Sequence, residues 1–494
     1  MGLPIEKENF TKADYDLFSA RLHAHLETLS TLLDEPDFGL GEQTFGAELE
    51  MSIVDSKLNP SLISHHIIQH ANDPLLQHEL NQYNLEYNLS PVRFQNKPFS
   101  MIHQEMSTAL NRINQQCAQF DSQAVTIGIL PILKKSHISK DFMTNEKRYH
   151  ALSNITKELK NGKFKLNING VESLQMENDD LTLEGANTSF QVQLKVPPHE
   201  FVDLFNAIQI ASPLAIALGA NSPTLMNKIL WDETRITLFK QTVDCRRDDL
   251  YTEWRQPNRV PFGYGWLRQS ALECFAENVC LYPPLLPICK PKEMKPNKND
   301  GPDLFELKVQ QGVVWHWNRA IYDEADGGHL RIELRTLPSG PTKRDMLANA
   351  AFLIGLSYAI KKNINKFLVS FPFMFAEYNF YRASKHGLQA ELIWPLTQED
   401  YSQARPVVDI LQYYFPMVKE SLLEIGIAQE EVKWVMDIIE ARSHNKQNGA
   451  NWQKELIYKF EHKHSREEAV KLMFEQYIKN SLQDKPVHEW SKEI

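Results

Sequence analysis

The amino-acid sequence predicts an α+β protein in which helices pack on an antiparallel sheet. Four segments alternate polar and apolar residues with a period of two, which is typical of strands that bury one face. Longer segments between them repeat apolar residues at helical spacing, and the pattern is mostly helical from about residue 398. We therefore expect a sheet-containing domain over residues 1–397 and a mostly helical region over residues 398–494.

Strands are expected where short alternating or apolar runs meet turn-forming residues. The first such run follows the turn DEPDFGLGEQ, and a later one is closed by Pro197 and Pro198, which cannot continue a sheet ladder. In chain order the expected strands are 46–55, 82–92, 124–133, 188–196 and 329–342, the last of which ends in a turn.

Helices are expected where apolar residues recur every three or four positions. In chain order the expected helices are 10–34, 62–71, 100–123, 199–219 and 342–362. Residues 132–185 are polar and mixed, so loops with short elements are expected there. Residues 290–303 are rich in Lys, Pro and Asn, which indicates a loop, interpreted either as a simple connection or as a lid.

The composition is that of a soluble globular protein. Apolar residues make up 42% of the 494 residues and charged residues 23%, and the length fits two or three domains or one large domain with an addition. The net charge of −10 argues against a broad nucleic-acid surface, and we find no apolar run long enough to span a membrane. Five scattered cysteines without a CxxC pair favour a reducing compartment. We expect a cytoplasmic protein, monomeric or homodimeric, without nucleic-acid or membrane partners.

The polar face of the alternating strands is rich in oxygen and arginine, with no lysine until Lys195 at a strand end. One interpretation is a sheet face in contact with water. The other is a site for Mg²⁺ and phosphate, because Mg²⁺ takes hard oxygen ligands and arginine holds phosphate or carboxylate. A divalent ion would let Glu48 and Glu50 tolerate each other on one side of a strand. The polar positions are Glu48, Glu50, Ser52, Asn84, Glu86, Asn88, Ser189, Gln191, Gln193, Arg331, Glu333 and Arg335.

Five segments in order along the chain carry a resemblance to a known family. They are GAELE at 46–50, ELNQYNLEYNLSPV at 79–92, NTSFQVQLKV at 187–196, ANSP at 220–223 and RIELRTLPSGPTKRDMLANAAFLIGL at 331–356. Together they resemble the second group of the glutamate–cysteine ligase family, which belongs to the glutamine-synthetase-like carboxylate–amine ligases. The resemblance implies a curved antiparallel sheet that forms a funnel, with helices packed outside and the polar strand faces lining the funnel.

The resemblance also implies roles for residues that fall on the family motifs. Metal ligands are expected at Glu48, Glu50, Glu86 and Glu333, and at Gln191, which stands where some members have a metal-binding histidine. Catalytic roles are expected for Arg335, which would contact the reacting phosphoryl and carboxylate groups of the ATP and the donor, and for Arg331 and Glu333. Substrate contacts are expected from Glu79, Gln193, Asn221 and Arg319.

The implied reaction is ATP-dependent amide formation with two or three Mg²⁺ ions as cofactors. The γ-carboxylate of glutamate would attack the γ-phosphate of ATP, and an amine, in the first instance that of cysteine, would attack the resulting acyl phosphate. Three alternatives stay open: another amine acceptor with the same chemistry, a phosphotransferase on the same scaffold, and a non-catalytic scaffold.

Other candidates have two interpretations each. Arg319, in VVWHWNRAIYD, is either a contact for ATP or a substrate carboxylate, or the end of a Trp-rich core strand. The segment with His65, His66 and His70 is more typical of a surface helix than of a metal site. FGYGWL at 262–267 lacks a phosphate-loop pattern and is interpreted as a turn or a close-packing site. Arg255 and Arg259 lie close to it in sequence and are candidates for contact with a substrate carboxylate.

Overall fold

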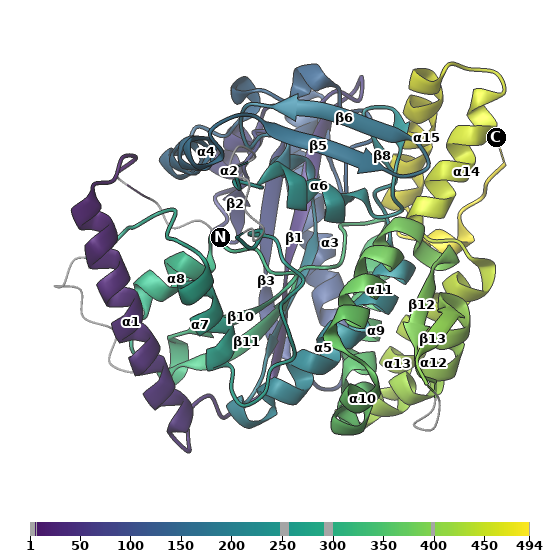
Figure 1. The fold of residues 1–494 in the computed structure, drawn as a ribbon. Coiled ribbons are helices and arrows are strands. Elements are labelled where there is room, and N and C mark those ends of the chain that lie inside the picture. The colour runs from purple at the N-terminus through teal and green to yellow at the C-terminus, as the bar shows by residue number, and fades with distance from the viewer. Residues whose placement is uncertain (1–4, 6, 248–255, 291–299, 397–400, 494) are drawn as a thin grey trace.

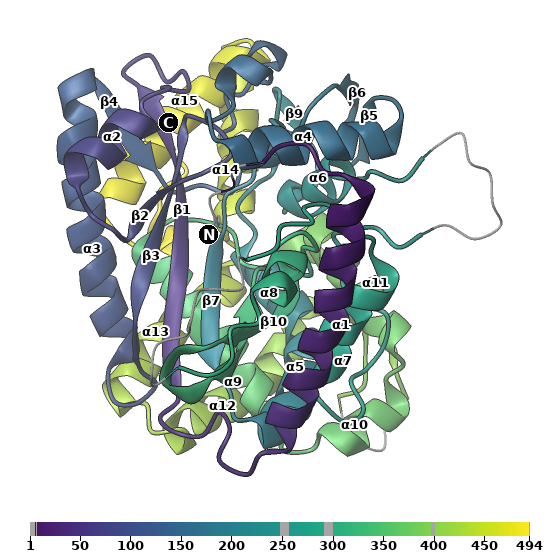
Figure 2. The same cartoon turned by 90° about the vertical axis from the view of Figure 1, so that its left-hand side faces the viewer.

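A curled antiparallel sheet forms the centre of the computed structural model, which describes residues 5, 7–247, 256–290, 300–396 and 401–493. Its strands run in the order β10-β11-β7-β1-β3-β2, and β4 pairs with the far end of β1. Figures 1 and 2 show the sheet from two directions. The strands are β1 (Thr44–Asp55), β2 (Leu76–His78), β3 (Asn84–Arg93), β4 (Ser122–Val125), β7 (Phe190–Lys195), β10 (Asn318–Asp323) and β11 (His329–Leu334).

One face of the sheet is covered by apolar helices. The helices α5 (Pro198–Gly219) and α9 (Lys343–Lys361) pack on each other, and α3 (Pro98–Cys117) packs on β3 and β4. Leu49, Met51 and Ile53 of β1 are fully buried and belong to this core, as their alternation predicts. The predicted α+β architecture, a curved antiparallel sheet with helices packed outside, is confirmed.

Other helices lie on the opposite side of the sheet. Figure 1 shows α1 (Lys12–Asp34), α7 (Leu272–Leu281) and α8 (Phe305–Gln311) together on this side, and α1 contacts both α7 and α8. The helix α4 (Lys147–Lys160) lies above α8 in Figure 2. The polar sheet face is therefore roofed by helices and is not open to bulk water along its whole length.

The remaining elements complete the two sides. Helices α12 and α13 pack on α9, and α14 and α15 pack on each other beside a second apolar cluster that includes Val54 and Trp452. The remaining helices and strands are α2 (Ser64–Ala71), α6 (Thr234–Thr242), α10 (Ile364–Ser370), α11 (Phe373–His386), α12 (Val407–Glu424), α13 (Gln429–Asn445), α14 (Gly449–Glu461), α15 (Arg466–Leu482), β5 (Phe164–Asn169), β6 (Ser173–Asn178), β8 (Thr224–Leu225), β9 (Lys228–Ile229), β12 (Glu391–Trp394) and β13 (Gln403–Pro406).

Three sequence expectations differ from the structure. The strand expected over 124–133 ends at Val125, since the chain leaves the ladder there. Residues 132–185 hold a full helix, α4, whose pattern is weak because its buried side includes Ser153 and Thr156. They also hold the hairpin β5–β6, and the alternation of Phe164, Leu166 and Ile168 with polar residues in β5 is a strand signal that the expectation of loops missed. The short strand β2 was not expected, because three residues carry no readable period.

The helix α5 passes the length and composition test for a membrane span, contrary to the sequence expectation, but most of it is buried in the core. The hairpin β12–β13 pairs residues from both sides of position 397, and α12 and α13 share the apolar core with α9. The division of the chain after residue 397 stays a prediction.

Candidate active site

A cavity of about 600 Å³ lies between the polar face of the sheet and the helices that roof it. Its floor comes from β1, β3, β7 and β11, and its walls from α4, α7 and α8. Its volume is within the range of sites for small molecules. The charged lining residues are Glu48, Glu50, Glu79, Glu86, Arg148, Glu184, Lys308, Arg319, Asp323, Glu324, Arg331 and Arg335.

Strand register brings the predicted residues together. Glu50 pairs with Glu86 across β1 and β3, and Glu48 pairs with Gln191 across β1 and β7. Gln193 in turn pairs with Glu333 across β7 and β11. Since directly opposed residues on neighbouring strands have Cβ atoms about 4.5–5.5 Å apart, these side chains form one continuous polar surface.

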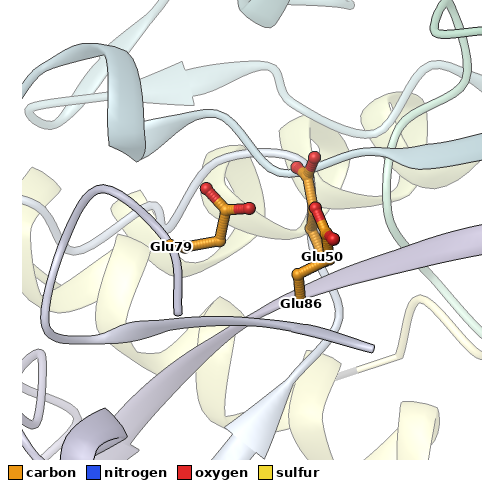
Figure 3. Close-up of side chains that lie close together, drawn as sticks. All are labelled: Glu50, Glu79 and Glu86. Atoms are coloured by element: carbon orange, nitrogen blue, oxygen red, sulfur yellow. The ribbon is translucent and has the colours of Figure 1, made fainter. Parts of the chain in front are cut away.

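Three carboxylates converge at the end of this surface near β2. Glu50 comes from β1, Glu86 from β3 and Glu79 from the connection between β2 and β3. One oxygen from each lies within 4.8 Å of the others, and Figure 3 shows the three side chains gathered around a common space. The sequence expectation that acidic residues from separate segments meet in one cavity therefore holds for these residues and for Glu48, which lines the same cavity.

The protonation of these acids is strongly perturbed. Burial raises the pKa of Glu48 and of Glu79 well above the usual range, and the charge of Glu86 raises both further. Burial and Glu86 also raise the pKa of Glu50. Like charges in a poorly solvated site favour the neutral form unless a cation is present. Among the residues that the structure describes, the buried Glu48 Oε2 finds no hydrogen-bond partner. This set of hard oxygen donors fits a divalent cation such as Mg²⁺.

Glu333 lies behind the cavity wall and not on it. Its side chain is fully buried, and Arg319 donates to both carboxylate oxygens, at 2.7 Å to Oε2 and 3.1 Å to Oε1. Burial alone would raise its pKa, but Arg319 and Arg335 outweigh that effect and lower the pKa to about 2. Glu333 therefore acts in this structure as an anchor for two arginines, and its predicted role as a metal ligand stays a prediction.

Arg335 follows β11 and reaches the cavity. Its Nη1 donates to Gln191 Oε1 and, at 3.3 Å, to Glu333 Oε2. Gln191 Nε2 donates to Glu50 Oε1, so both ends of this amide have protein partners. Gln193 Nε2 bridges Glu48 and Glu333 at 3.1 and 2.8 Å, and Gln193 does not line the cavity. The two glutamines thus link the acidic side of the site to its arginine side.

Asn221 lies outside the cavity and is fully buried. Its Nδ2 donates to Ser339 O at 2.8 Å and to Tyr477 Oη at 2.9 Å, and its Oδ1 accepts from Gln453 Nε2 at 2.9 Å. These contacts tie the loop after β11 to α14 and α15. The structure therefore places Asn221 among protein partners, and its predicted substrate contact stays a prediction.

A buried ion pair next to Asn221 holds the backbone of Arg335. Glu233 accepts from the Asn221 main-chain N–H at 2.8 Å and from Arg235 Nε at 3.1 Å. Arg235 then donates to Thr336 O at 2.6 Å and to Arg335 O at 3.3 Å. Sequence reasoning missed this pair, because nothing in its local pattern indicates that α6 meets the end of β11.

Several other predicted residues lie at the rim or elsewhere. Arg331 lines the cavity and forms an ion pair with Asp323 at 3.1 Å. Arg319 lies in β10, where it is buried, and it also lines the cavity. Its expected contact with ATP or a substrate carboxylate stays a prediction. Arg259 donates to Val313 O and Pro283 O. Arg255 and residues 291–299 of the proposed lid lie outside the described residues.

Sequence reasoning also missed the wall that faces the acidic cluster. Arg148 and Tyr149 of α4 line the cavity, as does Glu184 of a short 3₁₀ turn before β7. Burial and the charge of Glu50 raise the pKa of Glu184 to about 7 against the opposing effect of Arg335. The weak pattern of residues 132–185 hides these side chains, and no signal short of the fold assigns them to the site.

Comparison with known families supports a ligase relationship. The model of glutamate-cysteine ligase family 2 matches residues 44–258, which is less than half of the chain but includes Glu48, Glu79, Glu86 and Gln191. The resemblance expected from the motifs is thereby confirmed over that range. Among curated protein sequences, none matches this chain significantly.

Solved structures give a similar answer at low sequence identity. The glutamate–cysteine ligase of Francisella tularensis in complex with AMP has a TM-score of 0.50 and 10% identity, covering 92% of this chain and 90% of that one. A bifunctional glutathione synthetase of Pasteurella multocida (TM-score 0.44, 10% identity, 94% and 55% coverage) and the complex of prokaryotic ubiquitin-like protein with its ligase (0.38, 11%, 87% and 72%) are more distant. The first likeness agrees with the predicted fold, a curved antiparallel sheet with helices packed outside.

Proposed function

We propose that this protein, which matches the model of glutamate–cysteine ligase family 2 over residues 44–258, is an ATP-dependent carboxylate–amine ligase. The leading reaction joins the γ-carboxylate of glutamate to the amine of cysteine and yields γ-glutamylcysteine, ADP and phosphate. The observation that carries the proposal is the convergence of Glu50, Glu79 and Glu86 in one cavity that Arg335 also lines. An acidic cluster beside an arginine provides both charge types that phosphoryl transfer needs.

The acidic cluster suits Mg²⁺, which would be held by Glu50, Glu79 and Glu86, with Glu48 as a further oxygen donor. When bound, Mg²⁺ would neutralise the phosphate charges of ATP. The raised pKa values of Glu48, Glu50 and Glu79 support this assignment, because these acids are poorly solvated and have no cation among the described residues that fully compensates them. Gln191 supports the cluster by its hydrogen bond to Glu50.

Arg335 would hold the oxygens that gain or lose charge during transfer. Its guanidinium is fixed on one side by hydrogen bonds to Glu333 and Gln191. Arg335 also lines the cavity. Arg319 fixes the far side of Glu333. Such preorganised donors lower the barrier because they need no reorientation when charge moves, and loss of one typically costs roughly 2.7–4 kcal/mol in the transition state.

The apolar parts of the cavity would exclude water from the acyl phosphate. Phe275 of α7 and Leu304 and Leu307 near or in α8 line the side opposite the sheet, and Leu152 of α4 adds to it. Water exclusion limits hydrolysis of a reactive intermediate and strengthens the electrostatic contacts inside the site.

The experiment is an amino-acid panel read by phosphate release, with mass spectrometry of the products. Phosphate release that needs MgATP, glutamate and an amine, together with an amide product, supports the ligase. If phosphate release needs MgATP, glutamate and an amine other than cysteine, the acceptor differs and the ligase chemistry stays as proposed. Release with one acceptor and no amide favours a phosphotransferase, and failure to bind ATP at all favours a scaffold; either result contradicts the proposal.

A further inference from the structure

Arg148 differs from the other basic side chains of the cavity. Arg319 and Arg335 are paired with Glu333, Arg331 with Asp323, and Lys308 with Glu324. Within the described part of the chain, Arg148 forms no hydrogen bond or ion pair, although it is partly buried and lines the cavity at the first turn of α4. A partly desolvated guanidinium without a partner is costly, and its planar fork matches a carboxylate.

Glu184 is the acidic counterpart among the residues that line the same cavity. Over the described residues its carboxylate accepts no hydrogen bond and joins no ion pair, whereas Glu48, Glu50 and Glu86 accept hydrogen bonds from Gln193, Gln191 and Asn88. Glu184 is also partly buried and lines the cavity. It therefore offers an acceptor for a cationic group of a ligand.

Tyr149 ties the two groups to one region. It follows Arg148 in α4, and its pKa is raised well above the usual value by burial and by neighbouring carboxylates that include Glu79 and Glu184. Its hydroxyl donates to His78 O at 3.2 Å, so the ring is fixed in the wall. Arg148 and Glu184 line the same cavity as Glu50, Glu79 and Glu86, and the charge of Glu79 acts on Arg148 as that of Glu50 acts on Glu184.

We propose that Arg148 and Glu184 form a recognition subsite for the head group of a free α-amino acid, with Arg148 binding its α-carboxylate and Glu184 its α-ammonium. This subsite rests on the proposed ligase function and assigns the donor amino acid to it. The acceptor amine must be unprotonated to attack, and a carboxylate that holds an ammonium opposes that. The donor keeps both head-group charges throughout, while its side-chain carboxylate extends toward Arg335 and the acidic cluster.

Substrate analogues that lack one head-group charge test each residue separately. Glutamate is compared with 4-aminobutanoate, which lacks the α-carboxylate, and with glutarate, which lacks the α-ammonium. In Arg148→Gln the preference in kcat/KM for glutamate over 4-aminobutanoate should fall by about 10–100-fold, as expected for a lost charged hydrogen bond, while the preference over glutarate stays. In Glu184→Gln the preference in kcat/KM for glutamate over glutarate should fall by the same factor, while the preference over 4-aminobutanoate stays. Arg148→Lys should recover part of the lost preference, because it keeps the charge without the fork.

Lys157→Gln is the matched control, since it removes a largely exposed cation of the same helix that pairs with Asp179 at 3.7 Å. Its preferences should equal those of the wild type. A purely structural role for Arg148 would reduce all substrates together, and a rise in the KM for ATP alone would assign Arg148 to phosphate; either result overturns the subsite.

Failure of the subsite differs from failure of the ligase proposal. An active wild type with unchanged preferences in both variants refutes the subsite alone. A wild type that releases no phosphate with any amino acid refutes the ligase, and the subsite is then decided by equilibrium binding of glutamate and its two analogues to the Mg²⁺-supplemented protein. Equal binding of the three ligands, or none, overturns it.

Discussion

Arg319 and Glu333 face each other across β10 and β11, and the guanidinium donates to both carboxylate oxygens at 2.7 and 3.1 Å. Both side chains are almost completely buried. The carboxylate of Glu333 is thereby fixed behind the cavity wall, and Arg335 donates a hydrogen bond to it from the cavity side. The orientation of Arg335, which lines the cavity, thus depends on a carboxylate that itself does not line it.

Neutralising this anchor should destabilise the protein. Glu333→Gln leaves Arg319 buried without its counter-charge, and breaking a buried ion pair from one side costs about 3–5 kcal/mol. The free energy of unfolding in urea measures the loss. Replacing both partners, as in Arg319→Met with Glu333→Leu, should cost less than the sum of the single changes. Additive losses would show that the two charges do not interact.

Mg²⁺ should stabilise the protein, and more so at higher pH. The folded-state pKa values of Glu48, Glu50 and Glu79 are raised, so the stability that they contribute is present below their unfolded pKa of about 4.5 and is lost as pH rises through the raised values. Mg²⁺ binds the deprotonated acids and offsets this loss. Thermal melts with and without MgCl₂ should give a larger increase in Tm at about pH 8 than at about pH 6.

The same melts supply their own control. Glu50→Gln and Glu86→Gln should reduce the Mg²⁺-dependent increase in Tm, whereas Glu172→Gln, which removes a surface acid paired with Lys228 and Arg466, should leave it unchanged. An equal increase in Tm for all these proteins would mean that Mg²⁺ binds elsewhere.

Loss of a cluster carboxylate should abolish turnover without unfolding the chain. Glu86→Gln removes one charge from the group of acids within 4.8 Å and should relieve part of the like-charge repulsion, so its Tm without Mg²⁺ should not fall. Phosphate release with MgATP and the active substrate pair, together with circular dichroism, measures both effects. A wild-type rate in Glu86→Gln would refute the assigned metal role.

Arg235 should affect the rate more than substrate affinity. It holds the carbonyls of Arg335 and Thr336, and a displacement of about 1 Å in a catalytic group can cost about 10²-fold in rate. Arg235→Gln should therefore lower kcat by about 10–100-fold with little change in the KM values. Arg466→Gln, which removes an arginine paired with Glu461 and Glu172 on the surface, is the control. An unchanged kcat in the folded Arg235→Gln protein would remove the positioning role.

The local pattern was sufficient for the strands that build the floor of the cavity. The alternation of Glu48 and Glu50 with Leu49 and Met51 is a property of neighbouring residues, so it predicts which side chains share a sheet face. The same alternation predicts Glu86 on the polar face of its strand, the family resemblance added Glu79, and the structure brings both to Glu50. These assignments needed only spacing along the chain and motif identity.

The tertiary structure alone decided where the remaining charges point. Glu333 turns to Arg319 because β10 pairs with β11, Asn221 is enclosed by α14 and α15, and Arg148 and Glu184 reach the cavity from α4 and a turn without a readable pattern. Such contacts join residues far apart in sequence, and they follow from strand register and helix packing. A local sequence pattern contains neither the strand register nor the helix packing, because the free energy that selects these contacts comes from burial of surfaces that meet only in the folded chain.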